Sequence, residues 1–156
     1  MAAPSNVWTV EPSAGDPSDP WPEGVRAERL LDRPPGTKLV AGVWELDPGA
    51  ASPAYHVHHA AEELLLVLRG QPTLRTPEGQ RPLAEGDVVH FPIGRAGAHQ
   101  ILNQSSATVR YVMVAAHSPL DIIEYVDEGK IVGYSRAESL LVETPLFFEH
   151  QLPRDE

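Results

Sequence analysis

The stretch HVHHAAEELLLVLRG, residues 56–70, places two histidines and a glutamate directly before a run of leucine and valine. His56 and His58 are two positions apart, so on a β-strand their side chains point to the same face of the sheet. Glu63 follows across a short predicted turn and begins a second strand, which ends at Gly70. Adjacent strands of this kind bring the three side chains together, so the stretch predicts a β-fold that carries a cluster of ligating groups.

The second of these strands has two faces of different character. Strand alternation directs one set of side chains into the domain, namely Glu63, Leu65 and Val67. It directs the other set outward, namely Leu64, Leu66 and Leu68. Because these leucines are apolar, we expect a second sheet layer or a partner subunit to cover them.

The rest of the chain predicts an all-β domain. Sixteen prolines and twelve glycines disfavour long helices. Short apolar segments separated by turn signals predict strands at residues 38–46, 55–58, 63–69, 73–76, 88–91, 99–102, 108–115, 122–126 and 131–134. Many short strands of this kind are typical of a sandwich or barrel. The segment 23–31 fits a short helix and a strand equally well.

The length of 156 residues corresponds to one domain, in which we distinguish three parts. Residues 1–24 are rich in proline but contain Trp8 and Trp21, so we expect an extended arm packed on the body or, as we prefer, on a partner subunit. Residues 25–134 form the predicted β-barrel. Residues 135–156 form a C-terminal extension that covers either the barrel mouth or a dimer interface.

Charge and composition exclude several classes of function. The 22 acidic and 12 basic residues give a net charge of −10, which argues against binding to nucleic acid or to an anionic membrane. Cysteine is absent, so disulfides, thiolate metal sites and cysteine nucleophiles are excluded. No apolar run approaches the roughly 18 residues of a membrane span, and no secretory signal is apparent. We therefore expect a cytoplasmic protein.

A further histidine completes a predicted metal site. His99 lies on a separate predicted strand, after the turn Pro92-Ile93-Gly94. Three imidazoles and one carboxylate suit a single divalent transition metal: Mn, Fe, Co, Ni, Cu or Zn. Glu62 is an alternative to Glu63 as the carboxylate. The remaining histidines are expected at structural or surface positions, namely His59, His90, His117 and His150.

Two spacings carry a resemblance to a known family. The first is His56-Val57-His58, four residues, Glu63, six residues and Gly70. The second is Gly86, five residues, Pro92-Ile93-Gly94, four residues, His99, three residues and Asn103. In order and separation these motifs, which lie within residues 38–116, resemble those of the cupin superfamily, and the chain is similar to a small single-domain cupin of the type-2 barrel kind.

This resemblance implies a double-stranded β-helix, or jelly-roll, barrel that forms a homodimer and binds a metal through His56, His58, Glu63 and His99. The six-residue spacing to Gly70 favours Glu63 over Glu62. The motif glycines are expected where turns require a positive φ, and the Asn103 side chain is expected to close a turn.

A metal with these ligands carries a net positive charge, so we expect a small anionic molecule as its partner. The hypothesis is a mononuclear-metal enzyme, an oxidoreductase of the dioxygenase type or an isomerase. The alternative is a cupin that binds a small ligand without catalysis, as a sensor or pathway accessory. The candidates for the wall around the metal are Tyr55, Gln100, Ile101 and Tyr111.

Overall fold

The computed structural model describes residues 4–16, 19–32, 37–116, 118–135 and 147–153. These residues form strands joined by turns, with a single 3-10 turn, η1 (Arg95–Gly97). No helix in this part of the chain is long and apolar enough to cross a membrane. In chain order the strands are β1 (Gly15–Asp16), β2 (Asp19–Pro20), β3 (Val25–Arg29), β4 (Leu39–Leu46), β5 (His56–His58), β6 (Glu62–Arg69), β7 (Thr73–Thr76), β8 (Gly79–Pro82), β9 (Val88–Phe91), β10 (Gln100–Leu102), β11 (Val109–Ala116), β12 (Leu120–Tyr125), β13 (Lys130–Ser135) and β14 (Phe147–Gln151).

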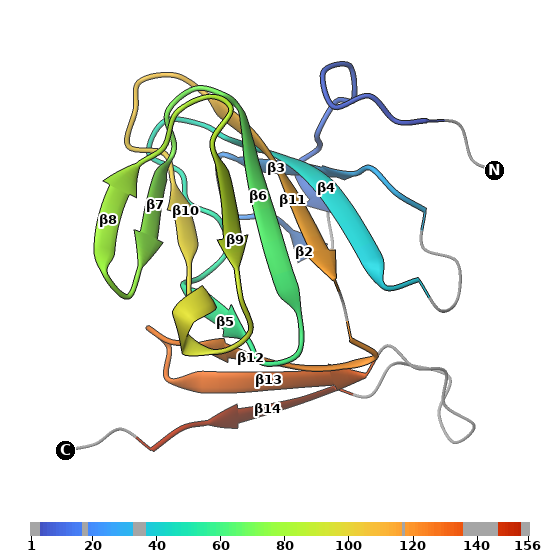
Figure 1. Ribbon diagram of the computed structural model, residues 1–156, viewed down its shortest axis with the longest axis vertical. Helices are drawn as coiled ribbons and strands as arrows, with labels where there is room; N and C mark the ends of the chain where they lie inside the picture. The colour runs from blue at the N-terminus through green and yellow to red at the C-terminus, as the bar shows by residue number, and fades with distance from the viewer. Residues whose placement is uncertain (1–3, 17–18, 33–36, 117, 136–146, 154–156) are drawn as a thin grey trace.

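Two layers of antiparallel strands make up the barrel (Figure 1). One layer is the five-stranded sheet β3-β4-β11-β6-β9. The other consists of the sheets β14-β13-β12-β5 and β10-β7-β8, which meet where the backbones of His56 and His99 pair. Along the chain, the strands thus switch repeatedly between the two layers. This arrangement confirms the expected all-β jelly-roll.

The structure decides between the two predictions for segment 23–31. Its residues form β3, an edge strand that pairs with β4, with Val25 opposite Leu46 in the core. The sequence prediction missed several strands because their residues do not alternate between apolar and polar. The clearest case is β8, all of whose residues are exposed.

The expected alternation along β6 is confirmed. Leu65 is fully buried, whereas Leu64 on the opposite face is 38% exposed. The inward side chains join one apolar core with those of neighbouring strands, among them Leu46, Val67, Leu74, Ile101 and Val109. Glu63 is the first inward residue of β6, at the end of this core, and it pairs with the core residue Phe91 of β9.

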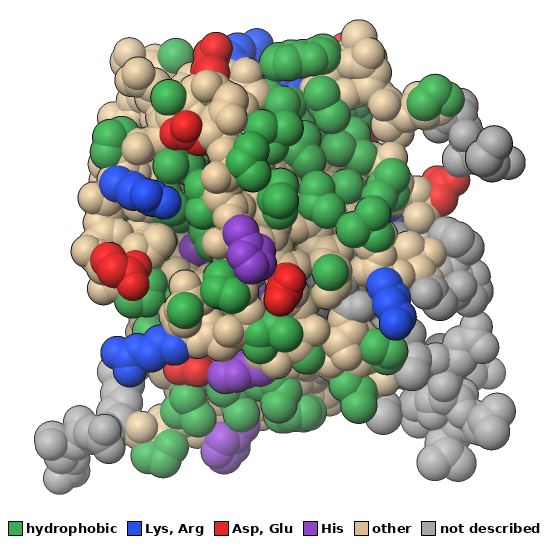
Figure 2. Space-filling view, in the orientation of Figure 1, with side chains coloured by type: hydrophobic (Ala, Val, Ile, Leu, Met, Phe, Trp, Pro, Cys, Tyr) green, Lys and Arg blue, Asp and Glu red, His purple; other side chains and the backbone are tan. Residues whose placement is uncertain are grey.

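The outer face of the five-stranded sheet is apolar. Figure 2 shows hydrophobic side chains gathered over β4, β6 and β11. On β9, Val88 is 60% exposed opposite Leu66 of β6, on the same face as the exposed Leu64. This face is the one on which the sequence predicts a cover.

The turns that close the barrel have the predicted geometry. Gly70 has a φ of 83°, and a Cβ at this position would lie 3.0 Å from Val109 Cγ1. A larger residue there would be strained and would press on the core. The Asn103 side chain closes its turn as expected: Nδ2 donates to Leu46 O and Ala107 O, and Oδ1 accepts from Ser105.

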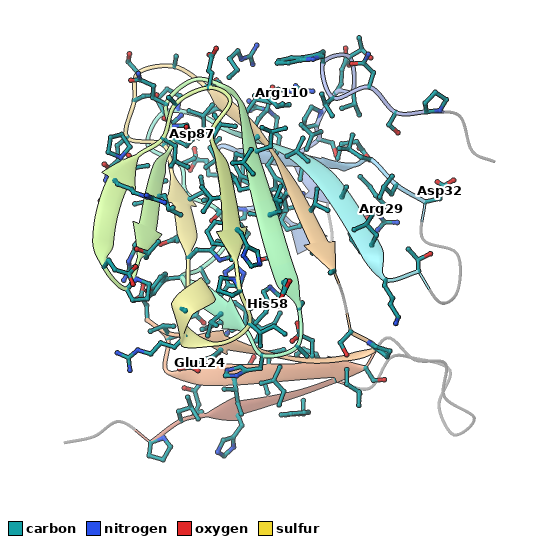
Figure 3. The ribbon with its side chains drawn as sticks, in the orientation of Figure 1. Arg29, Asp32, His58, Asp87, Arg110 and Glu124 are labelled. Atoms are coloured by element: carbon teal, nitrogen blue, oxygen red, sulfur yellow. The ribbon has the colours of Figure 1, made fainter. Side chains whose placement is uncertain are left out.

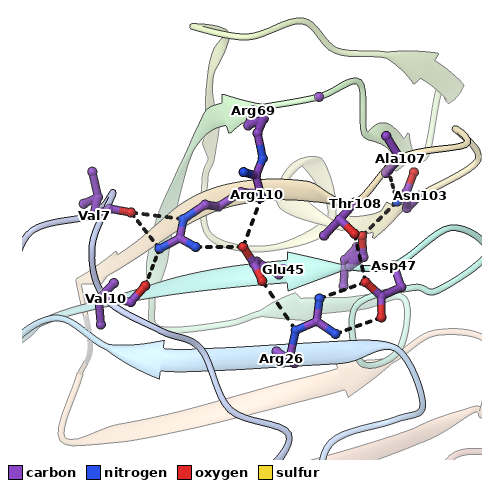
Figure 4. Close-up of polar contacts among 12 residues, drawn as sticks. Val7, Val10, Arg26, Glu45, Asp47, Arg69, Asn103, Ala107, Thr108 and Arg110 are labelled. Carbon is purple, nitrogen blue, oxygen red and sulfur yellow. Dashed lines mark hydrogen bonds and ion pairs between the residues drawn. The ribbon is translucent and has the colours of Figure 1, made fainter.

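A buried arginine attaches the N-terminal arm to the barrel (Figure 4). Arg110 on β11 donates from Nε and Nη2 to Val7 O, at 3.0 and 2.8 Å, and from Nη2 to Val10 O at 2.6 Å. Its Nη1 donates to Glu45 Oε1 at 2.7 Å. These contacts pack the arm on the barrel of its own chain. Packing of the arm on a partner subunit stays a prediction.

From this clamp the arm continues around the edge of the sheet. Ser13 pairs with Ala27 of β3, and Trp21 then reaches the inner face, where its ring centroid lies 4.9 Å from that of Trp44. The arm therefore joins the outer face of the barrel to the region of its mouth.

Removal of the clamp should destabilise the fold. We predict that Arg110→Ala lowers the free energy of unfolding by about 2–4 kcal/mol, because two carbonyl groups and Glu45 lose a charged partner. Arg69→Ala is the control, since Arg69 reaches the same Glu45 from an exposed position and should cost less than about 1 kcal/mol. Urea unfolding measures both; equal effects would contradict the role of the clamp.

Candidate metal centre

Four predicted ligands converge on one point inside the barrel. His56 and His58 lie on β5, Glu63 on β6, and His99 just before β10. Glu63 Oε2 is 3.8 Å from His56 Nε2, 3.5 Å from His58 Nε2 and 3.3 Å from His99 Nε2. Figure 3 shows His58 in the space between β6 and the layer of β12 and β13.

The other ring nitrogen of each histidine faces an acceptor. His56 Nδ1 is 3.3 Å from Ala54 O, His99 Nδ1 is 2.9 Å from Gly97 O, and His58 Nδ1 is 2.6 Å from Asp121 Oδ2. An acceptor at Nδ1 places the proton there in a neutral imidazole, which leaves a lone pair on Nε2. The three rings thus present lone pairs toward the Glu63 carboxylate.

This arrangement leaves Glu63 without a donor. Among the described residues, its Oε2 is the one buried side-chain oxygen or nitrogen that has no hydrogen-bond partner. A buried carboxylate oxygen facing lone pairs is costly unless a cation lies between them. The candidate ligand atoms of His56, His58 and Glu63 lie within 4.8 Å of one another, so these residues could hold a metal ion.

Burial sets the protonation of the site. It lowers the pKa of His56 to about 4, aided by the charge of His58, and that of His99 to about 3, aided by His56. Burial also raises the pKa of Glu63, against the opposing effect of His58. Both histidines are therefore neutral near pH 7, as metal ligation requires.

Local backbone geometry holds the histidines in place. Ala54, which accepts from His56, is the one described non-glycine residue with a positive φ, 42°. Gly97, whose carbonyl oxygen accepts from His99, packs closely on Pro92. A Cβ at position 97 would lie 1.8 Å from the carbonyl oxygen of Pro92. The ring of Phe91 stacks on His99 with centroids 3.7 Å apart. The turns before β5 and before β10 thus fix two ligand rings.

Asp121 fixes the third ring. Its side chain is fully buried, and besides His58 it accepts from the backbone N–H of Ala60 at 2.9 Å. Burial is the largest single effect and acts to raise the pKa of Asp121. The hydrogen bond and charge of His58, together with the backbone N–H groups of Ala60 and Ile122, outweigh it, so the pKa is lowered. Such an ionised carboxylate behind a ligand histidine orients the ring and increases its basicity.

A cavity of about 180 Å³ opens beside the four groups. Its wall consists of Trp44, Ser52, Pro53, Tyr111, Met113, Ile123 and Tyr125, together with His56, Glu63 and His99. Of the four wall residues expected from sequence, only Tyr111 lines it. The other three face elsewhere: Tyr55 lies under Arg75, Gln100 bonds to Ser52 O, and Ile101 is in the core.

The structure also separates Glu63 from the alternative ligands. Glu62 points out of the barrel and lies 3.5 Å from the exposed His90. His59 is exposed and faces Glu124, and His150 is exposed on β14. His117 lies outside the described residues.

Sequence reasoning missed Asp121 and most of the cavity wall. Asp121 reaches His58 because β12 pairs with β5, a contact between residues 63 apart in the chain. Trp44 and Met113 had a usable signal, since they share the inward parity of their strands with Leu46 and Tyr111.

Comparison with known proteins agrees with this geometry. Residues 42–115 match the Cupin domain family. A cupin-superfamily sugar phosphate isomerase from Silicibacter pomeroyi is 25% identical, with a TM-score of 0.70, over 81% of this chain and 76% of that one. No curated protein matches significantly. The match of residues 42–115 and the fold shared with solved cupins confirm the resemblance to the cupin superfamily that the two motifs carry.

Two further solved structures share the fold. A Cupin 2 conserved barrel protein from Salinispora arenicola is 23% identical, with a TM-score of 0.52, over 70% of this chain and 91% of that one. The polyketide cyclase RemF from Streptomyces resistomycificus is 23% identical, with a TM-score of 0.59, over 74% of this chain and 79% of that one.

The contact behind His58 gives a prediction for metal affinity. In Asp121→Asn, one of the two acceptor oxygens becomes an NH₂ group, so either Ala60 N–H or His58 Nδ1–H loses its acceptor. We expect Zn²⁺ or Mn²⁺ affinity, measured by titration, to fall about 10–100-fold. The control is Asp127→Asn, a substitution in the β12–β13 turn. Unchanged affinity in Asp121→Asn would contradict the orienting role.

The lowered histidine pKa values predict a pH dependence of stability in the metal-free protein. Unfolded histidines titrate near 6.5, whereas folded His56 and His99 stay neutral down to about 4 and about 3. Between the folded and unfolded pKa values, the unfolded state binds two more protons than the folded state through His56 and His99. Glu63 has the opposite effect, because its raised pKa lets the folded state bind one more proton than the unfolded state. The free energy of unfolding therefore falls as the pH drops from about 6.5 toward 4.

Urea unfolding of chelator-treated protein between about pH 7 and about pH 4.5 measures this fall. His99→Gln should flatten the profile, because the substituted side chain takes up no proton in either state. A free energy of unfolding that is independent of pH over this range would contradict the burial of neutral histidines.

Proposed function

We propose that this cupin is a mononuclear-metal enzyme in which His56, His58, Glu63 and His99 hold one divalent transition metal. The observation that carries the proposal is the buried Glu63 Oε2, which has no donor and faces three imidazole lone pairs. A divalent cation satisfies all four groups at once, and three imidazoles with a carboxylate are suitable ligands for Mn, Fe, Co, Ni, Cu or Zn.

The charge of the site favours a small anionic substrate. Neutral histidines and one carboxylate leave a net charge of +1 on a site that holds a divalent ion. A bound metal ion would supply a Lewis acid that polarises a carbonyl or stabilises a negatively charged oxygen. The chain provides a largely apolar cavity wall, which would strengthen electrostatic interactions beside it.

Tyr111 is the side chain best placed to assist the substrate. It lines the cavity, and burial together with the nearby Glu63 charge raises the pKa of its phenol. The hydroxyl therefore keeps its proton and can donate a hydrogen bond to an oxygen of the bound molecule.

Isomerisation is the reaction that we favour. The similarity to a sugar phosphate isomerase over most of both chains supports this choice. Oxidation with O₂ is the alternative reaction that the same four ligands permit. The identity of the metal distinguishes the two: Fe or Mn would favour oxidation, and Zn or Ni would favour isomerisation.

Elemental analysis of protein purified without a histidine tag or chelator tests the proposed centre. We predict about one equivalent of transition metal, reduced to below about a tenth in His58→Ala. His90→Ala is the matched control, because His90 is exposed on β9 and should leave the metal content unchanged. Full metal retention in His58→Ala, or no metal uptake by the unsubstituted protein, would contradict the proposal.

The non-catalytic alternative differs in its measurable consequences. A sensor or accessory protein would be stabilised thermally by its ligand without converting it. An enzyme would turn that molecule over, and Tyr111→Phe would slow the conversion while the metal remained bound.

We further propose that a second copy of the chain covers the apolar face of the five-stranded sheet. The exposed Leu64 and Val88 support this, as does the homodimer implied by the family resemblance. In light scattering coupled to size exclusion, we predict a dimer that dissociates in Leu64→Glu. The matched control Leu120→Glu alters an exposed leucine of the other layer. A dimer unaffected by Leu64→Glu would contradict this interface.

A further inference from the structure

The cavity beside the metal ligands has an unusual composition for a site that receives an anion. Apart from the three ligand side chains, its wall is almost entirely aromatic or aliphatic, with Ser52 as the one aliphatic hydroxyl. No lysine or arginine is among the described residues that line it. Recognition of a phosphate group normally requires such cations or several aligned backbone N–H groups.

Two basic residues beside the cavity, Arg75 and Lys130, are already paired. Both Nη atoms of Arg75 donate to the Asp127 carboxylate, at 2.6 and 2.8 Å, while its guanidinium stacks on Tyr55. Lys130 Nζ lies 2.7 Å from Glu128 Oε2. A phosphate dianion placed in the cavity would therefore keep most of its charge uncompensated, at a high desolvation cost.

Two parallel, stacked aromatic rings line the cavity. Trp44 and Tyr111 are paired across β4 and β11, with ring planes 4° apart and centroids separated by 6.5 Å. Gly42 allows the indole to lie along the strand, because a Cβ there would be 3.4 Å from Trp44 Nε1. Parallel aromatic surfaces of this kind favour a planar molecule in offset contact.

The cavity continues into a groove of about 930 Å³, with which it shares Trp44, Glu63 and Met113. Small side chains of β4 and β11 line the groove, and Trp21 of the arm lies against Trp44 at its side. Arg29 is the one arginine among the described residues that line the groove, and Figure 3 shows it apart from His58, near Asp32. A ligand too long for the cavity can extend along this groove.

We infer that the site takes a planar, largely apolar monoanion, an aromatic or conjugated molecule that presents one carboxylate, phenolate or enolate oxygen, and that it discriminates against sugar phosphates. This rests on the proposed metal centre, since one negative oxygen neutralises its single net positive charge. The flat apolar body lies against Trp44 and Tyr111, and its far end points along the groove beside Trp21. The similarity to a sugar phosphate isomerase then concerns the chemistry and not the substrate.

Three probes test this inference by isothermal titration calorimetry on protein whose metal content has been measured. They are 2-naphthoate, which has the flat body; acetate, which has only the head group; and ribose 5-phosphate. We expect 2-naphthoate to bind at least about tenfold more tightly than either of the others, because an apolar ring gains burial that acetate lacks and that a phosphate opposes.

Substitution of Trp44 separates the contribution of the ligand's aromatic body to affinity from that of its anionic head group. In Trp44→Ala, the affinity for 2-naphthoate should fall about tenfold and that for acetate should not change. Trp44→Phe retains an aromatic surface and should stay within about threefold of the unsubstituted protein. An equal loss for 2-naphthoate and acetate in Trp44→Ala would overturn the aromatic contact.

Introduction of a cation into the cavity wall should reverse the preference of the site for 2-naphthoate over ribose 5-phosphate. Met113→Lys places an ammonium group in the cavity wall, whereas Met113→Gln, of similar length, does not. We expect ribose 5-phosphate to gain at least about tenfold in Met113→Lys only. Binding of ribose 5-phosphate as tight as that of 2-naphthoate to the metal-loaded, unsubstituted protein would overturn the inference but leave the metal centre intact. Failure to take up metal would overturn both.

Discussion

The buried carboxyl group of Glu63 faces three imidazole nitrogens, and the geometry of the candidate site follows from this contact. A charged oxygen in this position has no donor among the described residues, so the site is stable only if its proton, or a cation, compensates it. Each imidazole is turned by a separate acceptor, supplied by Ala54, Gly97 or Asp121. Two backbone carbonyl groups and one carboxylate thus keep the imidazole lone pairs directed at one point.

The jelly-roll explains how these groups meet. His58 and Asp121 are neighbours because β5 pairs with β12, and Glu63 faces them from the opposite layer. Strand alternation places Leu65 and Val67 in the core below Glu63. The same sheet carries Trp44 and Tyr111 on its inner face and the Arg110 clamp on its outer face, so the arm and the cavity share one support.

Much of this could be predicted from sequence because it depends on local patterns. The spacing of His56, His58 and Glu63 and the turn glycines are properties of short segments, and they predicted the barrel and the convergence of its polar groups. The cavity wall depends instead on strand pairing at long range. Asp121 was missed because no local pattern relates it to His58, and Tyr55 was misplaced because its ring turns to Arg75 on another strand.

Anomalous diffraction from a crystal of the metal-loaded protein is the decisive test of the four-ligand centre. We predict one strong peak about 2.0–2.2 Å from Nε2 of His56, His58 and His99 and from a carboxylate oxygen of Glu63. A peak bound elsewhere, for example at the exposed pair of His90 and Glu62, with none among the four side chains, would contradict it.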